Sequence, residues 1–182
     1  MLEKQLELQG KKIIVVDEFF SAQDLRKLNL ICDATKVTRI GYSRPDAMDS
    51  AHYSTLESVE DVRQSKIFHM VSEKVSQYFP SCTECTRITY REIIYGDYLV
   101  YHTDGPKTNA TAMIYVNEEW KDDYRGETMF VGTDGLGLTV MPKPGRLVLF
   151  DASIMHSSST PSRVFFGARK ILVFNLVTPA AG

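Results

Sequence analysis

Hydrophobic positions in the early part of the chain recur at spacings typical of one buried strand followed by two helices. Residues 12–17 (KIIVVD) form a short apolar run that predicts a strand. Ser21, with Asp24 three residues later, predicts the start of a helix whose apolar face is formed by Leu25, Leu28 and Ile31. A second amphipathic helix is predicted over residues 58–79, where apolar residues again recur at helical spacing.

From Thr86 onward the pattern changes to short strand-like runs separated by turn residues. Asp134-Gly135 marks a hairpin turn, and the last run, RKILVFNLV, is apolar on both faces after its first two residues. The predicted strands cover residues 87–94, 98–103, 110–117, 127–131, 138–140, 146–150 and 169–177. This cadence predicts a β-sandwich or barrel, with the two earlier helices available to cover one sheet.

The 182 residues suit one domain, so we expect a single domain over residues 1–182. Strand and helical support would occupy residues 1–85, and the β core residues 86–182. The composition, with 43% apolar and 24% charged residues, is that of an ordinary globular protein. A net charge of -2 without a basic stripe gives no support for nucleic-acid binding.

Neither a secretory signal nor a membrane-spanning run is visible in the sequence, so we expect a soluble, cytoplasmic protein with no membrane partner. Three cysteines are an odd count, which argues against a disulfide framework. Cys82 and Cys85 have the spacing of half a zinc site, but no second ligand pair follows, and we interpret them as incidental thiols. The oligomeric state does not follow from the sequence.

The segment His102-Thr103-Asp104 is the sharpest chemical feature. Residues two apart in an extended chain point the same way, so the imidazole and the carboxylate would converge on one point. His156 follows the apolar run 146–150, in a segment too polar for simple core, and is the candidate third ligand. Two histidines and one carboxylate on one face form the triad that holds non-haem iron(II) and leaves coordination positions open.

The sequence around these residues resembles the prolyl 4-hydroxylase-like group of the 2-oxoglutarate and Fe(II)-dependent oxygenases, over about residues 95–177. The matching pieces follow the family's order: Tyr95-Gly96, the His102-x-Asp104 pair, the segment YVNEEW from Tyr115, the turn Arg125-Gly126-Glu127, the strand PGRLVLF before His156, and Arg169. Arg125 departs from the family's Gly-Gly-Glu turn, and the spacing from Tyr95 to His102 is short. Whether Tyr95 reaches the co-substrate is therefore open.

The resemblance implies a mainly β fold with flanking helices, in which a double-stranded β-helix, or jelly-roll, barrel of the cupin-like type carries the N-terminal helices on one sheet. It implies Fe(II) held by His102, Asp104 and His156, with 2-oxoglutarate and O2 as co-substrates, and it leaves a need for ascorbate open. Arg169 occupies the family's position for gripping the far carboxylate of 2-oxoglutarate, with Tyr115 and Tyr95 as further candidate contacts. Lys170 is the alternative to Arg169, which we favour because a guanidinium forks onto a carboxylate.

The implied activity is that of a 2-oxoglutarate-dependent dioxygenase, a hydroxylase that releases succinate and CO2. A peptidyl proline is one candidate substrate, and a free amino acid or another small metabolite is the alternative. Residues 41–55, predicted as a surface loop, and residues 107–111 are candidate substrate-facing segments. One competing class is a non-oxygenase metal enzyme or cupin-like barrel that uses the same ligands with zinc or manganese. Another is a cupin-like metal-binding module that has kept the barrel and lost oxygenase turnover.

Overall fold

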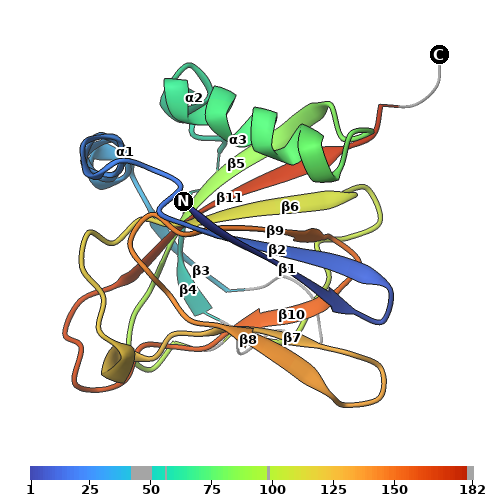
Figure 1. Cartoon of the computed structure of the whole chain (residues 1–182). Helices are drawn as coiled ribbons and strands as arrows, with labels where there is room; N and C mark the ends of the chain where they lie inside the picture. Colours follow the sequence, from blue (N-terminus) through green and yellow to red (C-terminus); the bar gives the residue numbers. More distant parts are fainter. Residues whose placement is uncertain (42–50, 56, 98, 180–182) are drawn as a thin grey trace.

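The structure is a computed structural model that describes residues 1–41, 51–55, 57–97 and 99–179. Two antiparallel sheets of unequal size form the body of the molecule, as in a jelly roll (Figure 1). The larger sheet contains β1 (Leu2–Leu8), β2 (Lys11–Asp17), β3 (Thr38–Gly41), β4 (Ala51–Ser54), β5 (Glu84–Ile93), β6 (Ala110–Tyr115), β9 (Leu147–Asp151) and β11 (Arg169–Val177). The smaller sheet contains β7 (Thr128–Val131), β8 (Gly137–Val140) and β10 (Met155–Ser158). This arrangement confirms the predicted mainly β fold.

The order of strands in the larger sheet is β1-β2-β9-β6-β11-β5-β4-β3, and in the smaller sheet β10-β7-β8. β11 lies between β5 and β6, and it pairs with both in antiparallel register. Because side chains alternate across a strand, each central strand presents one set of residues to the helices and the other to the smaller sheet. The apolar run of β11 is therefore buried on both faces, as its sequence predicted.

Three helices cover the outer face of the larger sheet, on the side away from the smaller sheet (Figure 1). They are α1 (Ala22–Ala34), α2 (Glu60–Arg63) and α3 (Lys66–Tyr78). Side chains from the helices and from this face of the sheet form one apolar core, which includes Leu28, Val71, Leu172 and Phe174. A second core fills the space between the sheets and includes Ile13, Phe130, Phe150 and Ile171. Among the described residues, no helix combines the length and apolar character needed to cross a membrane.

The helix predictions hold with one interruption. The Ser21 side chain caps α1 by accepting a hydrogen bond of 3.1 Å from the backbone N–H of Asp24. The second predicted helix is instead split into α2 and α3, because Ser65 adopts an extended backbone conformation. The Ser65 hydroxyl donates to the Val62 carbonyl oxygen at 2.7 Å, which satisfies the end of α2.

Several strands differ from the predicted ones. β1 was not predicted because its charged residues hide the alternation of an edge strand, most of which is exposed. Residues 98–103 were predicted as a strand, but the described part of this segment has only an isolated bridge at His102. β10, which carries His156, was missed because its polar sequence MHSS has no strand-like pattern.

The segment predicted as a surface loop, residues 41–55, has its central part, residues 42–50, outside the described residues. Gly41 is the last residue of β3, and residues 51–54 form β4, which pairs with β3 at the edge of the larger sheet. β4 also pairs with β5, where Ser54 lies opposite Arg91. This part of the predicted loop therefore extends the sheet beside the metal candidates.

Candidate metal centre and co-substrate pocket

His102 and His156 are brought together by their own backbones. The backbone N–H of each donates to the carbonyl oxygen of the other at 2.9 Å, in an isolated antiparallel bridge. Their ring centroids lie 4.5 Å apart. His156 is fixed in turn by the pairing of β10 with β7, in which it lies opposite Phe130.

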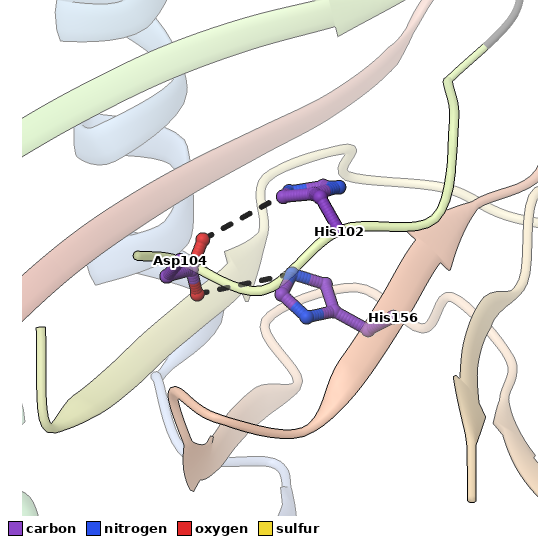
Figure 2. A group of neighbouring side chains, drawn as sticks. All are labelled: His102, Asp104 and His156. Carbon is purple, nitrogen blue, oxygen red and sulfur yellow. Dashed lines mark ion pairs between the residues drawn. The ribbon is translucent and has the colours of Figure 1, made fainter. Parts of the chain in front are cut away.

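Both imidazoles present the same nitrogen toward Asp104 (Figure 2). Nδ1 of His102 lies 3.0 Å from the Val100 carbonyl oxygen, and Nδ1 of His156 lies 2.9 Å from the Ile154 carbonyl oxygen. A carbonyl only accepts hydrogen bonds, so each Nδ1 carries a proton, and in the neutral form of the ring Nε2 then has the lone pair. The two Nε2 atoms lie 3.9 and 3.8 Å from the Asp104 carboxylate oxygens. One ligand atom from each of His102, Asp104 and His156 can be chosen so that all three lie within 4.8 Å of one another, a spacing that can hold one metal ion.

Asp104 is held in place by two further contacts. Its backbone N–H donates to the Ala152 carbonyl oxygen at 3.1 Å, and the Thr111 hydroxyl donates to its Oδ2. Thr111 belongs to β6 of the larger sheet, so this sheet orients the Asp104 carboxylate. Such hydrogen bonds to a metal ligand fix its orientation and raise metal affinity.

Burial lowers the pKa of His102 to about 4, and the neighbouring His156 acts in the same direction. The side chain is therefore neutral at physiological pH. A neutral imidazole is the form that binds a metal ion.

Arg169, at the start of β11, is fully buried between the sheets. Its Nε donates to the Gly126 carbonyl oxygen at 2.6 Å, and its Nη2 donates to the Thr128 hydroxyl at 2.8 Å. The Tyr115 hydroxyl lies 2.7 Å from the same Thr128 oxygen, and the guanidinium carbon lies 5.0 Å from the centre of the Tyr115 ring. Buried Nη1 has no hydrogen-bond partner among the described residues. Burial also lowers the pKa of the guanidinium.

The structure separates Arg169 from its sequence neighbour. Lys170 points to the helix side of the sheet, where its Nζ forms an ion pair with Asp33 of α1. Ile171 and Val173, the alternation partners of Arg169, line a cavity together with the metal candidates, as predicted. Tyr95 does not join this group, because its side chain is 61% exposed and it is not among the residues that line the cavity.

Two hollows meet at the metal candidates. The inner one is an enclosed cavity of about 20 Å³, whose described lining includes Met113, Thr128 and Phe150 as well as His102, Asp104 and His156. That volume holds about one water molecule, so the cavity has to widen for a larger ligand. The outer one is an open groove of about 370 Å³, which reaches His102 and Asp104 from the surface.

Two residues at this site, Thr128 and Arg91, were missed in the sequence, and two more, Thr111 and His52, lie in the candidate substrate-facing segments but were not singled out. Thr111 and Thr128 bond to predicted site residues, but a threonine in a strand carries no chemical signal of its own. Arg91 lies on the inner face of β5, in alternation with Thr89 and Ile93, and this period of two could have been read from the sequence. His52 is buried beside Arg91 and His102; burial lowers its pKa to about 3, and the Arg91 charge contributes.

Comparison with known proteins supports the resemblance noted in the sequence. The model of the 2OG-Fe(II) oxygenase superfamily matches residues 89–176, which include all three metal candidates and Arg169. No curated protein sequence matches this chain.

Solved structures share the fold at low sequence identity. A prolyl-4-hydroxylase from Pseudomonas putida is 16% identical, with a TM-score of 0.65, over 92% of this chain and 93% of that one. A 2OG-Fe(II) oxygenase family oxidoreductase from Burkholderia pseudomallei is 10% identical, with a TM-score of 0.72, over 93% and 87%. A prolyl hydroxylase from Trichoplax adhaerens, in complex with a hypoxia inducible factor peptide fragment, is 14% identical, with a TM-score of 0.69, over 91% and 83%.

The family match, the jelly-roll fold and the cluster of two histidines and an aspartate agree with one another. Over residues 89–176, just under half of its length, the chain is similar to the 2OG-Fe(II) oxygenase superfamily, a family that implies Fe(II), 2-oxoglutarate and O2.

Proposed function

We propose that this chain is a dioxygenase that hydroxylates a C–H bond of its substrate and converts 2-oxoglutarate to succinate and CO2. The observation that carries the proposal is that two groups of suitable binding residues lie on the same side of the larger sheet. One is the cluster of His102, Asp104 and His156, and the other is the buried guanidinium of Arg169.

His102, Asp104 and His156 would hold Fe(II). The donor set fits this ion, because two neutral imidazoles and one carboxylate leave coordination positions for a co-substrate and oxygen. The Nδ1 contacts leave both Nε2 atoms as the metal-binding nitrogens of the neutral rings, and Thr111 fixes the carboxylate that faces them.

Arg169 would bind the far carboxylate of 2-oxoglutarate. Its Nη1 is a buried donor without a partner among the described residues, and a carboxylate oxygen would satisfy it. Thr128 and Tyr115 lie beside the guanidinium and orient it through the shared Thr128 hydroxyl. Tyr95, the further contact that the resemblance implied, is exposed in this structure, and its role stays a prediction.

When bound, Fe(II) and 2-oxoglutarate would supply the oxidising chemistry, in which one atom of O2 enters succinate, the other enters the substrate, and CO2 is released. The chain's own residues orient the co-substrate and limit access of water. Phe130 and Phe150 pack against the His156 ring, with centroids 6.1 and 4.8 Å from it. This apolar wall shields one side of the metal candidates from solvent.

A peptidyl proline is the first candidate substrate, because two of the structural neighbours are prolyl hydroxylases, one of them in complex with a peptide. A free amino acid or another small metabolite is the second candidate. A metal-binding module without turnover is the alternative of another class.

The test is formation of succinate from 2-oxoglutarate by the Fe(II)-loaded protein in air, measured with and without a panel of prolyl peptides and free amino acids. Succinate formation that depends on Fe(II) and rises with one member of the panel supports the proposal. Tight binding of Fe(II) with no succinate under any condition would favour the metal-binding module.

A further inference from the structure

Arg91 stands where the inner cavity meets the outer groove. It lies opposite Ile171 in the pairing of β5 with β11, so its side chain points to the same side of the sheet as the cavity-lining residues. Arg91 lines both hollows, and it shares both linings with His102 and Asp104. A substrate that reaches the metal candidates through the groove therefore passes this guanidinium.

The Arg91 guanidinium has no carboxylate partner in the part of the chain that the structure describes. Its Nε is buried without a hydrogen-bond partner there. Other arginines do have such partners: Arg39 pairs with Asp97, Arg63 with Glu60 and Arg146 with Asp17. A buried donor on a cation is normally satisfied, so an unpaired one beside a reaction centre indicates an anionic ligand.

The described lining of the groove around Arg91 contains little negative charge. Arg87, four residues before Arg91 on the same face of β5, lines this groove together with Thr108 and Asn175. Asp104 is the only acidic residue among the described lining residues, and the proposed function assigns it to the metal. No other described carboxylate of this lining can therefore neutralise Arg91, which favours a negatively charged ligand beside it.

The co-substrate does not account for Arg91. The far carboxylate of 2-oxoglutarate already has Arg169, which is enclosed between the sheets and lines neither hollow. Arg91 is only partly buried and faces the open groove, which is the route from solvent. The two arginines are thus placed for two different anions.

We propose that Arg91 determines specificity by binding a carboxylate of the primary substrate, so that this oxygenase selects substrates that carry a carboxylate. The inference rests on the proposed function and narrows its substrate class. A guanidinium offers two parallel N–H donors to a carboxylate, which gives both affinity and orientation. The carboxylate could belong to a free amino acid or to an acidic side chain in a peptide.

The test measures binding of matched acids and amides to protein loaded with Fe(II) and 2-oxoglutarate without oxygen, by calorimetry. The probes are the proteinogenic L-amino acids against their carboxamides, and blocked peptides with Glu or Gln beside a proline. At least one acid should bind wild type at least 10-fold more tightly than its amide. A preference confined to the free amino acids or to the Glu peptides identifies the source of the carboxylate.

Two variants assign that preference to Arg91. Arg91→Gln should weaken binding of the selected acid at least 10-fold and of its amide less than 2-fold, while Arg91→Lys should give an intermediate loss. Binding of 2-oxoglutarate should change less than 2-fold in both. The inference is overturned if no acid is preferred, if Arg91→Gln keeps the preference, or if Arg91→Gln loses 2-oxoglutarate instead. Failure of wild type to bind 2-oxoglutarate at all would refute the proposed function itself.

Discussion

Thr111 donates a hydrogen bond to Oδ2 of Asp104, and this contact ties the carboxylate among the metal candidates to the central strand β6. Asp104 itself lies outside any strand, in the segment after the His102 bridge. The rigid sheet thereby sets the direction of a side chain that a loop carries.

Thr111→Val should therefore weaken Fe(II) binding while it preserves the fold. Valine keeps the shape of threonine but removes the hydroxyl, and loss of such a support typically costs about 10–100-fold in metal affinity. Competition with a chromophoric chelator measures this change. Thr139→Val, on the exposed face of β8, is the matched control and should leave the affinity unchanged. Equal affinities of Thr111→Val and wild type would show that Asp104 needs no support from β6.

Substitutions at Arg169 and Lys170 should separate the two basic residues that the sequence left as alternatives. Arg169→Lys removes the paired N–H donors that would bind a carboxylate. A hydrogen bond to a charged group contributes about 1.5–3 kcal/mol to the binding free energy. The dissociation constant for 2-oxoglutarate should rise at least about 10-fold. Lys170→Arg, on the helix side beside Asp33, should change it less than about 2-fold, as measured by anaerobic calorimetry. The reverse order of effects would assign the co-substrate to Lys170.

The turn before β7 contains an arginine where the backbone favours glycine. Arg125 has φ 58° and ψ -134°, a conformation that L-residues rarely adopt. Arg125→Gly should raise the free energy of unfolding by about 1 kcal/mol. Gly126→Ala should lower it by about 1–2 kcal/mol, because Gly126 has φ +79° and an added Cβ would lie 2.9 Å from Arg169 Cδ. Urea unfolding measures both, and a stabilising Gly126→Ala would contradict the described turn.

His52 should make the metal-free protein less stable in mild acid. Its pKa falls from 6.5 to about 3 in the folded state, first because of burial and then because of the Arg91 charge. Below about pH 6.5 His52 binds a proton in the unfolded chain but stays neutral in the folded chain. The free energy of unfolding therefore decreases as the pH falls from about 6.5 toward 3, by up to about 1.4 kcal/mol per pH unit for this group.

The comparison with His52→Asn isolates that contribution. Urea unfolding of both proteins between pH 7 and pH 4 should show a shallower loss of stability for His52→Asn, because asparagine does not titrate. Parallel curves for the two proteins would mean that His52 takes up its proton equally easily in the folded state.

Sequence reasoning reached the core of the fold and the principal candidates for the site because both have periodic or chemical signatures. The apolar run that begins at Arg169 predicted β11 with the bounds observed, and the capping pattern at Ser21 predicted the start of α1. His102 and Asp104 stood out because an imidazole and a carboxylate two residues apart in an extended chain must face the same way.

The rest depended on contacts between distant segments. His156 reaches His102 through β10, whose polar sequence resembles a loop, and Thr128 reaches Arg169 from the opposite sheet. Tyr95 was inferred as a co-substrate contact from the resemblance alone, and its side chain is exposed in the structure. Pairing between non-local segments is set by tertiary packing, which no local pattern encodes.

The central claim is that one site binds Fe(II) through His102, Asp104 and His156 and binds 2-oxoglutarate next to it. The most direct measurement is an anaerobic titration of metal-free protein with Fe(II) and then 2-oxoglutarate, watching for a visible iron-to-keto-acid charge-transfer band. Wild type and His69→Ala, altered at an exposed histidine of α3, should develop the band, and His156→Ala should not. A band of equal strength in His156→Ala, or no band in wild type despite bound iron, would contradict the account.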